Sequence, residues 1–128
     1  MFNFFRRVRM NNIIRARVNN KLIYTLVNFE TAKNMIESNE VILIDVRSKK
    51  EYDFMHIKNA KNITVEEIQN GKMNFLKENK IMVYCSSGTR SKSAISALNK
   101  LGYTNIYIWE YASLTTFPYK NMLIYHSN

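Results

Sequence analysis

Two uninterrupted apolar runs divide the chain, one at residues 41–44 and one at residues 81–84. Such runs are typical of parallel strands that are covered on both faces of a sheet. Residues 29–39 and 91–101 carry apolar side chains at helical spacing, which predicts two amphipathic helices. Strands that alternate with helices in this way predict an α/β domain with a mainly parallel central sheet flanked by helices.

Capping signals predict where three helices begin. Ser48 with Glu51 and Thr64 with Glu67 form two capping boxes, and Asn28 stands at the N-cap position of the helix that follows it. The remaining predicted elements are an edge strand at 21–27, short helices at 48–54 and 64–71, a brief strand at 61–63, a helical segment at 73–76 and a strand at 105–109.

The composition is that of an ordinary globular chain, with 46% hydrophobic and 23% charged residues among 128. This length suffices for one domain with its own core. A single cysteine excludes an internal disulfide and favours a reducing, cytoplasmic compartment. Two distant histidines, His56 and His126, do not supply metal-ligand spacing, and we expect no metal or cofactor. The chain has no apolar run of about 18 residues, so no membrane-spanning helix is expected.

The net charge of +9 is concentrated at the N-terminus. Residues 1–24 hold six of the 19 basic residues and no acidic one, which leaves 13 basic against 10 acidic residues in the rest. We therefore predict a flexible basic arm over residues 1–24 and a domain over residues 25–128. The arm also fits a basic amphipathic helix, so membrane-surface contact, a targeting role and a nucleic-acid or partner arm are alternative interpretations. The nearly balanced domain argues against nucleic acid as a partner.

The candidate chemistry lies in the six residues between the apolar run at 81–84 and the helix at 91–101. This loop begins with Cys85 and ends with Arg90. A short polar loop between a strand's C-terminal end and a helix N-terminus directs its backbone N–H groups inward, which forms a cradle for an anion. A cysteine at the base of such a cradle is favoured as the thiolate, the reactive form.

Five segments of the chain together resemble the rhodanese-like sulfurtransferase family. They follow the family's order and separations between residues 29 and 109. The segments are IDVR at 44–47, EY at 51–52, HI at 56–57 with Ala60 and Asn62-Ile63, VYCSSGTRS at 83–91 and LGYTNIY at 101–107. The resemblance implies a small three-layer, single-domain α/β protein with a six-residue active-site loop.

The resemblance also implies a role for each residue of the loop. Cys85 would be the nucleophile, which takes a sulfane sulfur from a thiosulfate or persulfide donor and passes it, as a persulfide, to a thiol or to cyanide. Five residues would bind the anion through backbone amides, hydroxyl groups or charge: Ser86, Ser87, Gly88, Thr89 and Arg90. The implied partners are a small sulfur-containing anion and a thiol or protein acceptor.

Loop length separates this family from cysteine phosphatases of related fold. Those enzymes have five residues between the cysteine and the arginine, whereas four residues separate Cys85 from Arg90. The shorter loop fits the smaller sulfur species, and a phosphatase or arsenate reductase is the less favoured alternative.

The chain departs from the family pattern at two places. Lys58-Asn59 stand where Pro-Gly is usual, and Tyr111-Ala112 stand where a Gly-Gly pair is usual. The second departure leaves open the conformation beside the mouth of the site, and we expect it not to touch the loop itself. It also motivates an alternative function, a non-catalytic module that binds a protein partner or senses redox state.

Three polar residues outside the loop have simpler structural interpretations. Asp45 and Arg47 follow a buried strand, and Arg47 is expected to pair with Glu51. His56 is expected to be a hydrogen-bonded structural residue rather than a general base.

Overall fold

The computed structural model describes residues 7–10, 13–18 and 22–126, with side chains from residue 22 onward. Its helices are α1 (Phe29–Glu37), α2 (Lys49–Phe54), α3 (Val65–Gln69) and α4 (Thr89–Lys100), with 3-10 turns η1 (Glu110–Ala112), η2 (Leu114–Thr116) and η3 (Lys120–Met122). Its strands are β1 (Arg7–Met10), β2 (Ile13–Val18), β3 (Leu22–Val27), β4 (Ile42–Asp45), β5 (Met55–Ile57), β6 (Lys61–Asn62), β7 (Ile81–Tyr84), β8 (Ile106–Ile108) and β9 (Leu123–Tyr125).

The main sheet has the strand order β1-β2-β3-β8-β7-β4-β6. Strands β3, β8, β7, β4 and β6 run parallel to one another, and β1 and β2 add antiparallel pairs at one side. The mainly parallel α/β architecture predicted from the sequence is therefore confirmed. The prediction of an edge strand at residues 21–27 is wrong in one respect, because β3 lies between β2 and β8.

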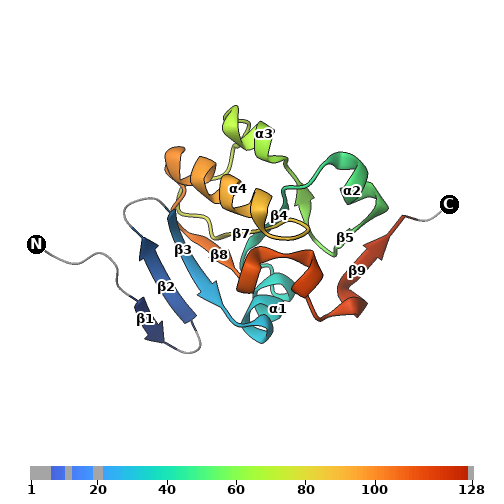
Figure 1. The fold of residues 1–128 in the computed structure, drawn as a ribbon, viewed down its shortest axis with the longest axis horizontal. Helices are drawn as coiled ribbons and strands as arrows, with labels where there is room; N and C mark the ends of the chain where they lie inside the picture. Colours follow the sequence, from blue (N-terminus) through green and yellow to red (C-terminus); the bar gives the residue numbers. More distant parts are fainter. Residues whose placement is uncertain (1–6, 11–12, 19–21, 127–128) are drawn as a thin grey trace, which may run out of the picture.

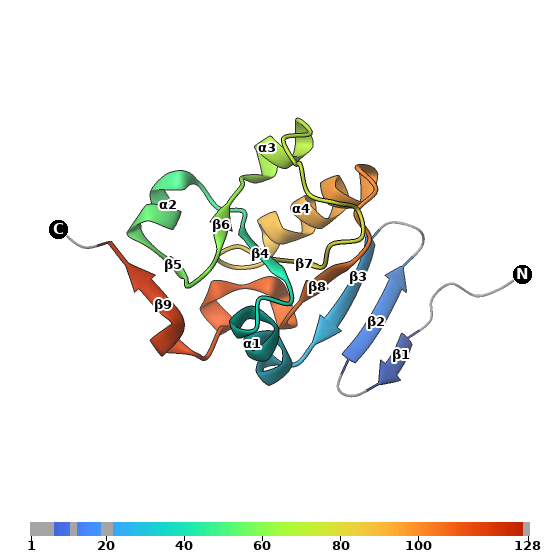
Figure 2. The ribbon, with the colours of Figure 1, turned by 180° about the vertical axis from the view of Figure 1, so that it is seen from behind.

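Two layers cover the two faces of this sheet, as the opposite views in Figures 1 and 2 show. Alternate residues of β7 point to opposite faces: Ile81 and Val83 pack with α3 and α4, whereas Met82 and Tyr84 pack with α1 and the segment after β8. All four of these side chains are fully buried. Cys85, the next residue, belongs to the cluster beneath α3 and α4, so the core itself fixes the base of the loop.

The three predicted helix starts are confirmed by their side-chain caps. The Thr31 backbone N–H donates to Asn28 Oδ1 over 2.8 Å. Both capping boxes form, with each serine or threonine accepting from the backbone of its glutamate and each glutamate accepting in return. The box of Ser48 and Glu51 begins α2 and places Glu51 next to the cysteine loop. The box of Thr64 and Glu67 begins α3, which contacts α4.

The helical segment predicted at residues 73–76 is wrong, since residues 72–80 form turns and bends. Backbone groups in this segment form hydrogen bonds with side chains in place of the hydrogen bonds of a helix. Asn79 Oδ1 accepts from the Leu76 N–H over 3.0 Å, and the Tyr103 hydroxyl donates to the Phe75 carbonyl over 2.6 Å. The apolar side chains of Met73 and Phe75 still reach the core beneath α4. The hydrophobic spacing was therefore a packing signal and not a helical one.

Strands β1 and β2 lie within the basic arm predicted at residues 1–24. These two segments are strands rather than the helix of the alternative interpretation, and β2 pairs along the whole of β3. The rest of residues 1–21 lies outside the described residues, and the boundary near residue 24 stays a prediction. Among the described helices, none has the length and apolarity needed to cross a membrane.

A small second sheet of β5 and β9 ties the C-terminal segment to the domain (Figure 1). The Lys58 backbone N–H donates to the Met122 carbonyl over 2.7 Å just beyond this pairing. Asn59, at the position of the usual glycine, has a φ of 76°, in the left-handed region that asparagine tolerates better than most residues. The departure from Pro-Gly thus supplies a donor that proline lacks and keeps the turn.

The Lys58 N–H should matter more for stability than the Lys58 side chain. Replacing Lys58 with Pro should lower the free energy of unfolding by about 1 kcal/mol or more, because the Met122 carbonyl loses its donor. Lys58→Ala retains the donor and should change the free energy of unfolding by less than about 0.5 kcal/mol. Urea denaturation of both variants would contradict this account if they were equally stable.

Candidate functional site

The side chain of Cys85 lies immediately beyond the C-terminal end of β7 and is only 1% exposed. Two backbone groups approach its sulfur. The Gly88 N–H donates to Sγ over 3.0 Å, and the Ser91 N–H donates to Sγ over 3.3 Å. Two N–H dipoles aimed at one sulfur stabilise negative charge on it, so the geometry favours a sulfur-centred anion at this position.

Helix α4 begins at Thr89, two residues earlier than the start predicted at Ser91. Thr89 and Arg90 therefore belong to its first turn, and Ser91 carries one of the N–H groups that have no partner within a helix. The N-cap residue is Gly88, which supplies no side-chain cap. The Cys85 sulfur takes the place of that cap, because it accepts from the first turn of a twelve-residue helix whose dipole is positive at this end.

The segment after β8 supports the loop through the backbone of Ala112 and Leu114. The Cys85 N–H donates to the Ala112 carbonyl over 3.0 Å, and the Leu114 N–H donates to the Cys85 carbonyl over 2.7 Å. The Ser91 hydroxyl also donates to the Ala112 carbonyl, over 2.9 Å. The expectation that the departure at Tyr111-Ala112 would not touch the loop is therefore wrong, since Ala112 is hydrogen-bonded to the cysteine itself.

Tyr111 and Ala112 both adopt left-handed backbone conformations, with φ values of 68° and 48°. Glycine occupies such positions without steric cost, which explains why a glycine pair is usual here. Each non-glycine residue there costs about 1–2 kcal/mol in backbone strain. The chain keeps the glycine-like backbone without the glycines, so the loop's support is preserved at a cost in stability.

Gly88 is held where no side chain fits. Its φ is 107°, and a Cβ at this position would lie 2.5 Å from the Tyr111 carbonyl oxygen. The turn at Tyr111 and the loop at Gly88 are therefore in close backbone contact, and this contact fixes the Gly88 N–H on the sulfur.

The Ser86 carbonyl oxygen gathers three hydrogen bonds from the C-terminal segment. It accepts from the Ser113 hydroxyl over 2.6 Å, from the Thr115 hydroxyl over 2.9 Å and from the Thr115 N–H over 3.1 Å. With its carbonyl fixed in this way, the first peptide of the loop cannot rotate freely. Ser86, one of the predicted anion-binding residues, thus has a clear structural role.

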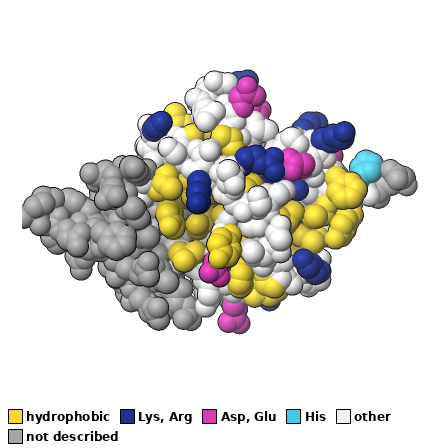
Figure 3. Space-filling model, viewed as in Figure 1, with side chains coloured by type: hydrophobic (Ala, Val, Ile, Leu, Met, Phe, Trp, Pro, Cys, Tyr) yellow, Lys and Arg dark blue, Asp and Glu magenta, His cyan; other side chains and the backbone are white. Residues whose placement is uncertain are grey.

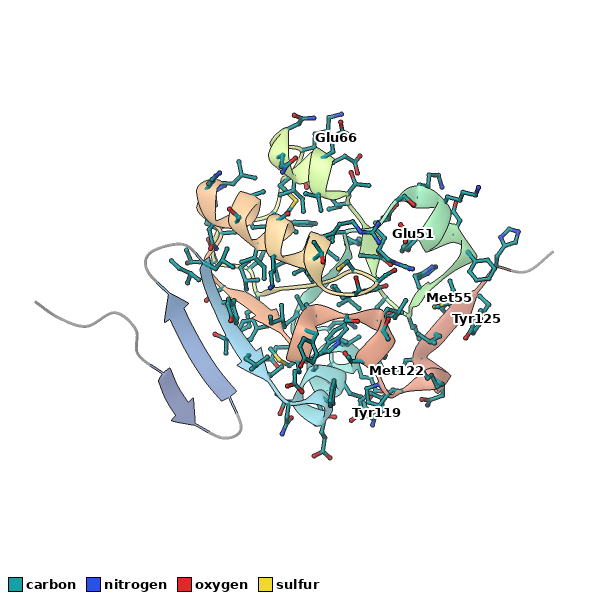
Figure 4. The ribbon with its side chains drawn as sticks, in the orientation of Figure 1. Glu51, Met55, Glu66, Tyr119, Met122 and Tyr125 are labelled. Carbon is teal, nitrogen blue, oxygen red and sulfur yellow. The ribbon has the colours of Figure 1, made fainter. Side chains whose placement is uncertain are left out.

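Arg90 is paired with Glu51 across the loop. Its Nη1 and Nη2 donate to Glu51 Oε1 and Oε2 over 2.6 and 3.0 Å, and the Ser86 hydroxyl donates to Oε2 over 3.3 Å. Figure 4 labels Glu51 between α2 and the first turn of α4. The Arg90 hydrogen bonds, with those of Ser48, lower the pKa of Glu51 to about 2 despite partial burial, and the same pairing raises the pKa of Arg90. That Arg90 orients an anionic donor stays a prediction.

The expected pairing of Arg47 with Glu51 is wrong, because Arg47 binds Asp45. Arg47 Nη2 lies 2.7 Å from Asp45 Oδ2, and both side chains are almost fully buried. Burial would lower the pKa of Arg47, but the hydrogen bonds and charge of Asp45 outweigh it and raise that pKa. Arg47 also donates to the Met55 carbonyl, so it joins β4 to β5 beneath the site. His56 Nδ1 lies 2.8 Å from the Tyr52 carbonyl, as expected of a structural residue.

Of the five loop residues predicted to bind an anion, Gly88 is the one whose described hydrogen bonds reach the Cys85 sulfur, and the five have different surroundings. Gly88 is buried, whereas Ser87 and Thr89 are exposed and line a pocket beside the loop. No role at the site was assigned from the sequence to four residues that contact the cysteine loop: Ser91, Glu51, Ala112 and Ser113. Ser91 had a usable signal, since the sequence placed it at the predicted start of the helix next to the cysteine. The other three lie far from the loop along the chain, and their positions depend on the tertiary fold.

The chain is similar to a known family and to several known proteins. The model of the rhodanese-like domain matches residues 28–111. A thiosulfate sulfurtransferase GlpE of Coxiella burnetii is 26% identical over 86 residues, which cover 67% of this chain and 80% of that protein. The uncharacterized protein YqhL of Bacillus subtilis is 35% identical over 65 residues, which cover 51% of this chain and 52% of that protein.

Solved structures have the same fold. A rhodanese-related protein from Thermoplasma volcanium superposes with a TM-score of 0.60 at 27% identity, over 71% of this chain and 87% of that chain. The human single-domain sulfurtransferase TSTD1 superposes with a TM-score of 0.60 at 24% identity, over 66% of this chain and 87% of that chain. The arrangement of sheet and helices is thus shared with these two proteins.

Two glycines allow the close contact at the loop to be tested. Gly71→Ala should cost about 1–2 kcal/mol of unfolding free energy, because its φ is 76° and a Cβ there meets nothing within 4 Å. Gly88→Ala should cost about 3 kcal/mol or more, because the clash with the Tyr111 carbonyl adds to the backbone strain. Equal losses in chemical denaturation would show that the contact at Gly88 is not needed.

The Glu51–Arg90 pair should make stability depend on pH in a defined window. The pKa of Glu51 is about 2 in the folded chain and 4.5 as the ordinary value, so its contribution is complete above pH 4.5 and is lost as the pH falls toward 2. Glu51→Gln lacks this titration. The difference in unfolding free energy between wild type and Glu51→Gln should shrink across that window, and a difference that stays constant with pH would contradict the pairing.

Proposed function

The chain belongs to the rhodanese-like domain family, and we propose on that premise that it is a sulfurtransferase which carries a sulfane sulfur on Cys85. The sequence similarity to a thiosulfate sulfurtransferase supports a sulfurtransferase-like enzyme at the level of the family. The observation that carries the proposal is the pair of backbone N–H groups, from Gly88 and Ser91, that donate to the Cys85 sulfur.

The proposed reaction has two steps. In the first, the Cys85 thiolate attacks the outer sulfur of thiosulfate, a new S–S bond forms, and the old S–S bond breaks with its electron pair leaving on sulfite. In the second, an acceptor thiolate attacks the outer sulfur of the Cys85 persulfide, and the electron pair of that S–S bond returns to Cys85 Sγ. Each step conserves charge and needs no further oxidant or reductant, which is the pattern of covalent catalysis.

The role of the loop is to stabilise the negative charge on sulfur. Cys85 is an anion before the first step and becomes the leaving anion in the second. Donors that are already aimed at Sγ stabilise that charge without any rearrangement during the reaction. Hydrogen bonds to the Ala112 carbonyl from Cys85 and Ser91, and to the Ser86 carbonyl from Ser113 and Thr115, hold these donors in place.

We also propose that Ser86, Ser87, Gly88, Thr89 and Arg90 line the path of the donor anion. The exposed positions of Ser87 and Thr89 support this for their hydroxyl groups. Arg90 is half-buried and bound by Glu51, so its charge would act on a donor from that paired position. The proposed partners are a small sulfur-containing anion and a thiol or protein acceptor. A reducing, cytoplasmic compartment is proposed because a chain with one cysteine cannot form an internal disulfide.

One observation favours a second candidate, a non-catalytic module that binds a partner or senses redox state. The Cys85 side chain is 1% exposed, whereas reactive cysteines are ordinarily accessible to their partners. In this alternative the sulfur would cap α4 structurally and would not exchange sulfur.

Sulfur transfer measured on the purified chain separates the two candidates. With thiosulfate as donor and cyanide as acceptor, the wild type should form thiocyanate, and mass spectrometry should find one added sulfur atom on the peptide that contains Cys85. Cys85→Ala should lose the activity by at least about a thousandfold, because the nucleophile is removed.

The matched control is Ser93→Ala, a change on the exposed side of the same helix. It should retain full activity. The proposal fails if Cys85→Ala is as active as wild type, or if the wild type neither turns over nor takes up sulfur, which would favour the non-catalytic module.

A further inference from the structure

The small second sheet consists of β5 and β9, and β9 lies at the outer end of the molecule (Figures 1 and 2). His56 and Ile124 lie opposite each other in the middle of the pairing. The His126 N–H donates to the Phe54 carbonyl over 2.8 Å, which extends the pairing by one residue. A sheet of two strands has two edges, and an edge whose backbone groups have no partner can pair with a further strand.

The edge formed by β5 is closed by hydrogen bonds within the domain. The Met55 N–H donates to the Glu51 carbonyl, and the Met55 carbonyl accepts from Arg47. The Ile57 N–H donates to the Tyr84 hydroxyl over 3.0 Å, and the Ile57 carbonyl accepts a backbone N–H over 3.0 Å. The backbone groups of β5 that point away from β9 are therefore all bonded, so a further strand cannot pair on that side.

The outer side of β9, which we call the open edge, has backbone groups without partners. The Met122 carbonyl and the His126 N–H are bonded to the chain at the two ends of β5. Because such bonds alternate along an antiparallel strand, the backbone of Leu123 and Tyr125 faces the opposite way. The Leu123 N–H donates to the Lys120 carbonyl. In the part of the chain that the structure describes, no partner is found for the Leu123 carbonyl or for the N–H and carbonyl of Tyr125.

Exposed apolar side chains surround the open edge. Phe54 is 69% exposed, Tyr125 is 59% exposed and Ile124 is 44% exposed. Figure 3 shows hydrophobic side chains gathered at this end of the molecule, with Lys or Arg side chains on either side of them. Large exposed apolar side chains beside unpaired strand backbone are typical of a surface that binds another polypeptide.

The surface around the open edge is basic. Lys120 immediately precedes β9 along η3, and Lys50 lies one helical turn before Phe54 on α2. Both lysines are exposed, and among the described side chains neither has a carboxylate within ion-pair distance. Asp53 on the same helix is already paired with Lys49 over 2.8 Å. The positive charge beside the edge therefore complements an acidic partner and opposes pairing with a second copy of this chain.

We propose that the open edge of β9 docks a protein partner, which adds an extended segment rich in carboxylates to this sheet as a third strand. Backbone hydrogen bonds to Leu123 and Tyr125 supply the pairing, and apolar side chains between the carboxylates cover Phe54. An anionic membrane also complements a basic, apolar surface, but it does not use the backbone groups of a strand edge. This docking is independent of sulfur transfer, because none of these groups belongs to the cysteine loop.

Titration of a peptide into the full chain tests the docking. The probe is a short, capped peptide in which glutamate alternates with valine. Amide NMR shifts should concentrate on β9 and the C-terminal end of α2, and the dissociation constant should weaken as salt is added. The same peptide with lysine in place of glutamate should bind at least about tenfold more weakly. Cys85→Ala should bind the glutamate peptide as the wild type does.

The backbone contribution is tested at Tyr125. Tyr125→Pro removes the outward N–H without removing a hydrogen bond to β5, and a sheet edge tolerates proline at such a position. Tyr125→Thr loses the ring but keeps the N–H. Tyr125→Pro should therefore bind the probe at least about tenfold more weakly than Tyr125→Thr, with urea denaturation as the check that both are folded. N-methylation of every amide of the probe tests the same bonds on the wild-type chain and should abolish binding.

Charge reversal tests the choice of an acidic partner. Lys50→Glu and Lys120→Glu should each weaken binding of the glutamate peptide at least about threefold. The control Lys72→Glu alters an exposed lysine beyond α3 and should change nothing. Undiminished binding of the N-methylated peptide, or NMR shifts centred on another part of the chain, would overturn the proposal. It would also be overturned if light scattering found a dimer joined through β9, or if the chain bound phosphatidylserine vesicles but not the peptide.

Discussion

The structure around the site depends on two hydrogen bonds, those from the Gly88 and Ser91 backbone to the Cys85 sulfur. They require β7 to end at the base of the loop and α4 to begin immediately above it. They also require a residue without a Cβ at position 88, since the Tyr111 carbonyl occupies that space. The N–H groups at the start of α4 need an acceptor, and the Cys85 sulfur is that acceptor. The same N–H groups would stabilise a sulfur anion, so one arrangement serves both the fold and the proposed chemistry.

The rest of the domain holds this arrangement from three sides. The C-terminal segment fixes the loop from one side through Ala112 and Ser113, and it is itself anchored by the pairing of β9 with β5. Glu51 fixes Arg90 from α2 on a second side. The buried Asp45–Arg47 pair joins β4 to β5 beneath. These contacts restrict motion of the loop, and preorganised dipoles of this kind stabilise charge more effectively than mobile ones.

The sequence predicted the parts of this structure that depend on local signals. The apolar runs, the two capping boxes and the strand–loop–helix order around Cys85 were all recognisable, because each is determined within a few residues. The pairing of Glu51 with Arg90, the role of Ser113 and strand β9 were not, because each joins segments far apart in the chain. The strained turn at Tyr111 could be located as a departure from the family pattern, but its backbone conformation follows only from the contact with the loop.

Amide NMR of the full chain tests the central claim most directly, by following Gly88 and Ser91 before and after reaction with a stoichiometric sulfur donor. If their N–H groups hold the charge on sulfur, both amide proton resonances should move when the thiolate becomes a persulfide, and should return when a thiol acceptor is added. The Cys85→Ala variant should show neither change. Resonances of Gly88 and Ser91 that stay in place while sulfur is taken up on Cys85 would contradict the account.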